Sequence, residues 1–399
     1  MFIAATQNIP EDAISGLNLF YLCPPTGRSA TMSHDSTDKR NQASIEATTA
    51  TPRNGASKTC SRPDYWIGCW LFALAAMVAV MVMIGGATRL TESGLSMVRW
   101  RPLTGWLPPL DDEEWATVFN AYRRYPEYRQ INMGMTPDEF KSIFWLEYIH
   151  RLWGRIIGLA FAVPFLFFWM RGWIRGIAIA RFGALFVLGG LQGVVGWYMV
   201  KSGLASQPDV SQYRLAAHLG FAFVIAGLLV WHGLTARVHG ATGRETAPSR
   251  RSKWGMALVC FVFATVLSGA LVAGLNAGLV YNTFPLMGGQ LPPPDYLPLS
   301  PLWRNFFEDI PSVQFHHRVL AIVALVSTLA FCWRFRRQGR KSRLSLTCLA
   351  AAICLQAVLG VLALIFAVPL PLGVLHQAGA LAVFLCLVWS LFSLRLKQK

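Results

Sequence analysis

Charged residues are scarce in this sequence, and acidic residues are the scarcest of them. Asp, Glu, Lys and Arg make up 14% of the 399 residues, only 20 residues are acidic, and 54% are hydrophobic. Several apolar runs of about 18–25 residues are long enough for a helix to cross the hydrocarbon core of a bilayer. This distribution excludes an ordinary soluble domain and predicts an all-α polytopic membrane protein.

Cysteine pairs with metal-binding or redox spacing are missing from the sequence. None of the eight cysteines forms a Cys-x-x-Cys motif, and most lie in or beside apolar runs, where Cys is a small apolar residue. The sequence therefore gives no sign of a disulfide framework or of a zinc site with tetrahedral ligand spacing.

The N-terminal region, residues 1–63, is polar and rich in Ser and Thr, and we expect it to be a disordered tail. An acid-poor, Arg-rich transit peptide is not expected, because Glu11 and Asp12 come early and Arg28 is the only Lys or Arg before position 39. No cleavable signal peptide is evident, and Met32 is an alternative start to Met1.

Hydropathy predicts eight membrane-spanning helices. They are residues 66–86, 147–169, 182–200, 214–235, 254–274, 314–333, 344–368 and 372–394. Most of the net charge of +16 comes from Lys and Arg in short loops between these spans. The charge is therefore a topology signal, not a sign of nucleic-acid binding, and it places the N-terminus in the cytoplasm or its mitochondrial equivalent. The loops at about 88–145 and 276–312 fall on the other side and are too long for simple connectors.

Four histidines, His150, His218, His317 and His376, each lie near the start of an even-numbered span. These spans run in the same direction, so all four imidazoles are predicted at similar depth near the outer face. Ionisable groups at the edge of a span are functional candidates. His34, His232, His239 and His316 are interpreted as bystanders.

The two halves of the sequence repeat. Leu-Gln-Gly-Val-Val-Gly at 191–196 parallels Leu-Gln-Ala-Val-Leu-Gly at 355–360, and His-Arg opens the second and sixth spans. Because each half has four spans, the halves share one orientation. We predict two pseudo-symmetric four-helix bundles, 64–240 and 241–399. Glu147 precedes His150 by three residues, whereas Gln314 precedes His317, so we expect chemistry in the first bundle and binding alone in the second.

Paired imidazoles from facing helices are a common way to hold heme iron in a bundle. Arg151 and Arg318 suit heme propionates, although both are equally well interpreted as snorkelling anchors. Glycines at 154, 158, 189, 190, 193 and 196 are expected to allow close approach of helices or of a flat macrocycle. The alternative for the histidines is four hydrogen-bonded interface residues.

The histidine motifs resemble those of the heme A synthase family. The matching stretches are Glu-Tyr-Ile-His-Arg at 147–151, Tyr-Arg-Leu-Ala-Ala-His at 213–218, Gln-Phe-His-His-Arg at 314–318 and Leu-His-Gln at 375–377, with 85–96 and 282–287 beside them. The resemblance covers about residues 65–395. The long first outer loop resembles the type found in mitochondria and alphaproteobacteria, and it lacks the cysteine pair of some bacterial members.

The resemblance implies oxidation of the C8 methyl group of heme O to a formyl group, which gives the heme A of terminal oxidases. It implies that His150 and His218 flank the substrate heme, and that His317 and His376 hold a permanent heme b. Glu147 would accept a proton or stabilise a cationic intermediate, and its alternative role is to orient His150.

The implied partners are the lipid bilayer, the farnesyltransferase that makes heme O and an electron donor, with homo-oligomerisation left open. A bacterial inner membrane is preferred, with the mitochondrial inner membrane as the alternative. Two other functions are alternatives: a bis-histidine b-type cytochrome that transfers electrons without modifying heme, and a transporter built from repeats. The transporter is disfavoured because charges near the bilayer midplane are few.

Overall fold

The computed structural model describes residues 61–100, 104–203, 210–243 and 250–396. Within these ranges it is helical and contains no β-strand. The predicted tail, 1–63, and the alternative start at Met32 lie outside the described residues except for the last three positions of the tail. The all-α prediction is therefore confirmed for the part of the chain that carries the apolar runs.

Eight long helices are apolar enough to cross a membrane, as the sequence predicts. They are α1 (Arg62–Leu90), α4 (Pro137–Met170), α5 (Ile177–Gly203), α6 (Gln212–His239), α7 (Arg250–Gly274), α8 (Ile310–Phe335), α9 (Arg340–Ile365) and α10 (Leu370–Arg395). The seventh predicted span, 344–368, is too long at its end. There α9 ends at Ile365, and positive φ angles at Ala367 and Val368 turn the chain into α10.

Short helices occupy the two long loops. The loop after α1 contains α2 (Asp112–Tyr122) and α3 (Pro126–Gln130), and the loop after α7 contains the 3-10 helices η3 (Ala277–Leu279) and η4 (Leu302–Phe306). A capping box fixes the start of α4: the Thr136 side chain accepts from the Glu139 N–H, and the Glu139 carboxylate accepts from the Thr136 N–H. This start lies ten residues before the predicted span, so α4 extends beyond its apolar run into the loop region.

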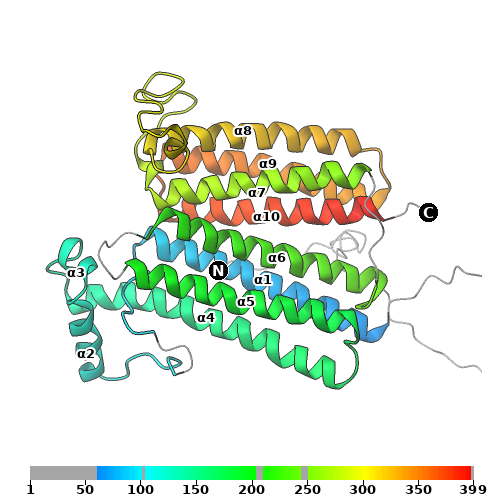
Figure 1. The fold of residues 1–399 in the computed structure, drawn as a ribbon, viewed down its shortest axis with the longest axis horizontal. Helices are drawn as coiled ribbons and strands as arrows, with labels where there is room; N and C mark the ends of the chain where they lie inside the picture. Colours follow the sequence, from blue (N-terminus) through cyan, green and yellow to red (C-terminus); the bar gives the residue numbers. More distant parts are fainter. Residues whose placement is uncertain (1–60, 101–103, 204–209, 244–249, 397–399) are drawn as a thin grey trace, which may run out of the picture.

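The long helices form two groups in Figure 1, which we call the first half (α1, α4, α5, α6) and the second half (α7, α8, α9, α10). In the first half α1 contacts α4 and α6, and α5 contacts α4 and α6; in the second half α7 contacts α8 and α10, and α9 contacts α8 and α10. The halves meet through α6 with α7, α1 with α10, and α6 with α10. This pattern pairs α1 with α7 and α6 with α10 as equivalents.

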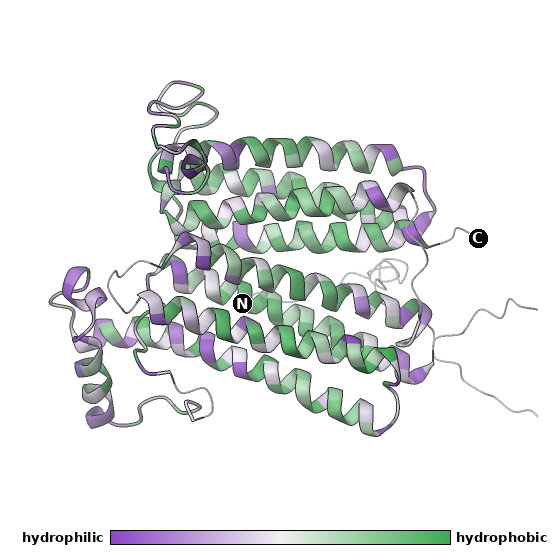
Figure 2. Cartoon of the chain, in the orientation of Figure 1, coloured by the Kyte–Doolittle hydropathy of each residue, from purple (hydrophilic) through white to green (hydrophobic). Residues whose placement is uncertain are grey.

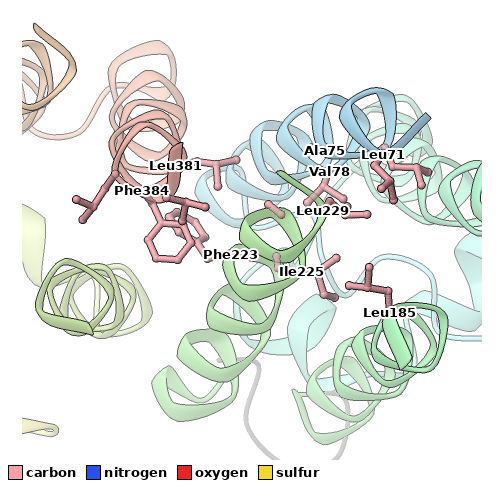
Figure 3. Packing of buried hydrophobic residues seen from close by; sticks show 14 of the residues in the cluster. Leu71, Ala75, Val78, Leu185, Phe223, Ile225, Leu229, Leu381 and Phe384 are labelled. Atoms are coloured by element: carbon pink, nitrogen blue, oxygen red, sulfur yellow. The ribbon is translucent and has the colours of Figure 1, made fainter. Parts of the chain in front are cut away.

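The core lies where the halves meet. Phe223 of α6 faces Phe384 of α10 across the interface, with their rings 5.6 Å apart, whereas Ile225 points from α6 toward Leu185 of α5 (Figure 3). A Cβ at Gly227 would lie 2.9 Å from the Phe384 ring, so this glycine permits the close approach of α6 and α10. Apolar residues cover the length of the helices and polar residues gather at their ends, as expected for a bilayer-spanning protein (Figure 2).

Polar contacts join the halves at the end that carries the two long loops, which we call the loop end (left in Figure 1). Arg89, in the last turn of α1, donates to the Ala273 carbonyl and to the Asn276 side chain, both at 3.0 Å. Gln377 of α10 donates to the Val82 carbonyl of α1 at 2.8 Å. Helix α1 is therefore bound to both helices that flank it in the second half.

Candidate heme site at the loop end

The structure places the four predicted histidines on α4, α6, α8 and α10, each within the first half of its helix and toward the loop end. His150 interacts electrostatically with His218, and His317 interacts in the same way with His376. Each half therefore brings together one pair of imidazoles. Among the described residues, no group of three His, Cys, Asp or Glu side chains could hold a metal ion.

Each imidazole packs against a glycine of the preceding long helix. An added Cβ would lie 3.3 Å from His150 Cε1 at Gly85, and 2.8 Å from His218 Cε1 at Gly196. In the second half, the corresponding distances are 2.9 Å for His317 at Gly269 and 2.8 Å for His376 at Gly360. A side chain at Gly196, Gly269 or Gly360 would displace the imidazole beside it, and one at Gly85 would require a shift of His150 by a few tenths of an ångström.

A hydrogen bond fixes the tautomer of His317. Ser268 Oγ donates to the Thr265 carbonyl at 2.7 Å and lies 2.8 Å from His317 Nδ1. Because the Ser268 hydrogen is used by Thr265, His317 Nδ1–H must be the donor in the second contact. The lone pair of His317 Nε2 is then free, which is the state that a metal ligand needs.

A glutamine supports the second histidine of each pair. Gln356 Nε2 donates to the His376 carbonyl at 3.0 Å and lies 3.1 Å from His376 Nδ1. Gln192 donates to the His218 carbonyl at 2.9 Å, but its amide nitrogen lies 3.5 Å from Nε2 of that ring. His218 Nδ1 is buried and has no partner among the described residues. The two equivalent imidazoles are therefore oriented differently.

Glu147 is 3% exposed and binds the loop that follows α1. Its carboxylate accepts from Ser96 Oγ and from the Met97 N–H, both at 2.6 Å, and forms an ion pair with Arg151. None of these partners is His150. The alternative role predicted for Glu147, orienting His150 through a hydrogen bond, therefore finds no such bond between these two residues.

Gln314 occupies the same place in the second half with reversed hydrogen-bond polarity. Its side-chain nitrogen donates to the Tyr281 carbonyl at 3.0 Å. Tyr281 follows Gly269 by the same twelve residues that separate Met97 from Gly85. The loop thus offers an N–H to Glu147 in one half and a carbonyl to Gln314 in the other.

Arg151 and Arg318 also bind these loops. Arg151 donates to the Met97 carbonyl at 2.9 Å, and Arg318 donates to the carbonyls of Tyr281 and Thr283, each at 2.7 Å. Arg318 Nε is buried and has no partner among the described residues. The predicted propionate contacts therefore remain a proposal, in which the arginines would bind loop and ligand together.

The predicted glycines differ in what surrounds them. Gly196 is in close contact with His218, and Gly154 lies 3.4 Å from Met81. At the other four positions, nothing lies within 4 Å of an added Cβ: Gly158, Gly189, Gly190 and Gly193. Gly189, Gly190 and Gly193 are exposed, so α5 has open space beside these positions. The motif alignment puts the larger Ile353, Cys354 and Ala357 at the corresponding positions of α9.

Several site residues were not predicted from the sequence: Gly85, Gly269, Ser268, Ser96 and the backbone of Met97. A constant offset of 184 residues relates Gly85 to Gly269 and Glu92 to Asn276, and the latter two have φ angles of 53° and 52°. This offset was a usable signal for the glycines. The bonds of Ser268 and Ser96 required the fold. His316, set aside as a bystander, stacks on Phe306 of the loop at 4.6 Å.

The fold and the paired imidazoles define a multi-pass membrane protein with two histidine-lined sites. A family model described as "Cytochrome oxidase assembly protein" matches residues 68–388, and the chain belongs to this family. It is 44% identical to the heme A synthase of Parvibaculum lavamentivorans, over 86% of this chain and 98% of the relative. It is also 44% identical to the heme A synthase of Rhodospirillum centenum, over 86% and 92%, and 45% identical to that of Nitrosospira multiformis, over 82% and 93%.

Proposed function

We propose that this chain is a heme A synthase, an oxidoreductase that converts the C8 methyl group of heme O into the formyl group of heme A. The similarity to curated heme A synthases over more than four fifths of the chain carries the proposal. The four glycine-packed imidazoles are the local feature that fits it. We place the protein in the bacterial inner membrane with its N-terminus in the cytoplasm, because the loops on that side carry the Lys and Arg excess.

In this proposal the second half, 241–399, holds a permanent heme b through His317 and His376. The Nδ1–H of His317 is bound to Ser268, so Nε2 is available as a ligand without a change of tautomer. Arg318 has an unused buried Nε that suits a propionate. These residues fit a permanent electron-relaying group better than a group that must leave.

The first half, 64–240, receives heme O between His150 and His218. Open space beside Gly189, Gly190 and Gly193 leaves room for a substrate that enters and departs, whereas larger residues occupy the equivalent positions of α9. His218 Nδ1 has no partner among the described residues, so its ring is less constrained than that of His317. Looser ligands suit a substrate that is exchanged after each reaction.

Heme O supplies the reacting methyl group, and the protein supplies a buried charge beside it. Glu147 is a carboxylate at the edge of the first site, and its counterpart Gln314 carries no charge. The carboxylate would accept a proton or stabilise positive charge that develops at the methyl carbon. Its ion pair with Arg151 and its bonds to Ser96 and Met97 hold it in one position for that task.

The farnesyltransferase that makes heme O is the expected upstream partner, and a separate electron donor is required. A b-type cytochrome that does not modify heme is the alternative outcome of the test that follows.

The test is mass spectrometry of hemes extracted from the purified protein and from two single variants. The wild-type protein should yield heme B together with heme O, its hydroxylated derivative or heme A. His150→Ala should keep heme B and lose the others, whereas His317→Ala should lose heme B. Heme B alone, at two per wild-type chain, would instead identify a cytochrome and refute the synthase.

A further inference from the structure

A second buried carboxyl group lies near the first site and has no role in the function proposed above. Glu127 of α3 is 3% exposed, and its Oε2 has no hydrogen-bond partner among the described residues. Burial, together with the negative charge of Glu147, raises the pKa of Glu127 to about 8. The Glu127 carboxyl is therefore protonated at neutral pH, although it belongs to a loop and not to a membrane span.

Aromatic packing holds α3, which carries Glu127, near the face of α4 that carries Glu147. Tyr122 of α2 packs against Tyr128, beside Glu127, at 5.8 Å and against Phe140 of α4 at 5.0 Å. Glu147 follows Phe140 by seven residues, which is two helical turns, so the two lie on the same face of α4. The helices α2 and α3 cover the loop end of α4 in Figure 1, and Glu127 belongs to this cover as a residue of α3.

Glu127 and Glu147 differ in how many partners they already have. The carboxylate of Glu147 is bound by Ser96, by the Met97 N–H and by Arg151. Glu127 keeps one oxygen uncommitted. Of the two acids, Glu127 is therefore the one that has a free oxygen available to accept a proton.

A third carboxyl group that acts on Glu127 is exposed to solvent. Glu92, at the turn after α1, is exposed, and its charge also acts on Glu127. Glu147 and Glu127 are buried and Glu92 is exposed, so the three carboxyl groups differ in their access to water. In the second half, amides replace both acids that have equivalents, because Gln314 corresponds to Glu147 and Asn276 to Glu92. Only the half assigned to chemistry carries the acidic series.

We propose that Glu127 transfers protons between Glu147 and water at the loop end, by way of Glu92. The inference rests on the proposed function, because conversion of a methyl to a formyl group removes two hydrogens from one carbon and requires proton exchange with water. The transfer is a proton step alone: the O–H bond of one carboxyl breaks as another forms, and no oxidation state changes. In this role Glu127 carries protons to and from Glu147 and does not contact the substrate.

The other polar groups around Glu127 leave it free to titrate. Asn132 donates to the Tyr122 hydroxyl oxygen at 2.8 Å, so the hydroxyl hydrogen of Tyr122 can point at the Glu127 carboxyl beside it. Burial raises the pKa of Tyr122, which therefore remains a neutral donor. Arg123, at the end of α2, lies over the rings of Phe119 and Tyr128 and does not act on the pKa of Glu127.

The test compares Glu127→Gln with Glu113→Gln, which removes an exposed acid from α2 of the same loop. Glu127→Gln should slow conversion of heme O by about tenfold or more, while heme B content stays at the wild-type level. The wild-type rate should change near pH 8, and this inflection should be absent from the variant. Glu127→Asp should restore part of the rate and the inflection. Glu113→Gln should match the wild type throughout.

Infrared spectroscopy provides a readout that does not depend on turnover. The C=O band of a protonated carboxyl should titrate near pH 8 in the wild-type protein and disappear in Glu127→Gln. A variant that lacks the band but keeps the wild-type rate and pH profile would overturn the proton role and leave the proposed function intact. A wild-type protein that contains only heme B would overturn the proposed function, whatever the band shows.

A stability measurement separates this role from misfolding. The pKa of Glu127 is raised from 4.5 to about 8, so the folded state keeps a proton that the unfolded chain loses in this range. The free energy of unfolding should therefore fall as the pH rises from about 4.5 to about 8. Glu127→Gln should remove that decline and be at least as stable as wild type at pH 8. A variant that is slow because it unfolds would refute the proposal.

Discussion

The two halves share one backbone plan and differ in the charge that it carries. In both, an imidazole packs against a glycine one helix away, an arginine follows the histidine, and a turn with a positive φ ends the first helix. The first half then has Glu147 and Glu92 where the second has Gln314 and Asn276. A repeated backbone arrangement can therefore keep its geometry while these ionisable groups are confined to one copy.

The rings themselves show a second difference. His317 is held through Ser268, whereas the position equivalent to Ser268 in α1 is Ile84, whose side chain cannot form a hydrogen bond. A fixed tautomer favours a ligand that never leaves, and a free ring favours one that is exchanged. Charge and ring support thus differ between the halves in the directions that the proposed division requires.

Replacing Glu147 with the glutamine found at its counterpart, Gln314, should have the largest effect on the conversion of heme O. We expect Glu147→Gln to lower conversion of heme O by about 10²- to 10⁴-fold, because the carboxylate that accepts a proton is lost. Heme B in the second half should be unaffected. The measurement is heme A formed per heme B, in membranes that contain heme O.

The reciprocal variant, Gln314→Glu, is the control. It places a carboxylate against the Tyr281 carbonyl, so heme B binding should weaken and no second catalytic site should appear. Full conversion by Glu147→Gln would show that the Glu/Gln difference has no catalytic role. It would then only match each side chain to its loop, which offers an N–H to Glu147 and a carbonyl to Gln314.

Filling the glycine beside each imidazole should have the next largest effect. Gly360→Ala should displace His376 and reduce heme B content, at a cost of about 1–3 kcal/mol for overpacking. Gly196→Ala should displace His218 and lower conversion while heme B stays bound. Heme spectra and product analysis of the two variants check this.

Gly193→Ala is the matched control on α5, because nothing lies within 4 Å of its added methyl group. Gly193→Ala should retain normal heme B, and its main effect should be on the binding of substrate heme O in the first half. Equal heme B loss in Gly196→Ala and Gly360→Ala would contradict the assignment of one heme to each half.

Removing the Ser268 hydroxyl should have the smallest effect. Ser268→Ala takes away the acceptor for His317 Nδ1–H, and loss of such a supporting partner lowers metal affinity by about 10-fold or more. We expect faster heme B dissociation and a shifted reduction potential, with folding unchanged. Ile84→Ser, which offers the same hydroxyl to the first half, should slow the release of its heme. Unchanged heme B dissociation in Ser268→Ala would show that the contact between Ser268 and His317 Nδ1 does not strengthen heme B binding.

Hydropathy and repetition were enough to predict the eight spans, the shared depth of the histidines and their equivalence, because helix length and charge bias are local properties of the chain. The supports of the site were not predictable in the same way. Ser96 precedes Glu147 by 51 residues and binds it across a loop, and α3 with Glu127 lies near α4 because aromatic rings join α3 to α2 and α2 to α4. Such contacts depend on where loops fold back, which no periodicity records.

The bond between Arg89 and α7 bears on the ancestry of the molecule. Position 89 is equivalent to position 273, so Arg89 of one repeat donates to the carbonyl of its own counterpart, Ala273, in the other. In a homodimer of identical four-helix subunits, this self-complementary contact would bring two arginines, or two alanines, face to face across the two-fold axis. Fusion of the copies into one chain permits an arginine on one side and an alanine on the other. The interface between the halves can then be asymmetric, as the two sites are.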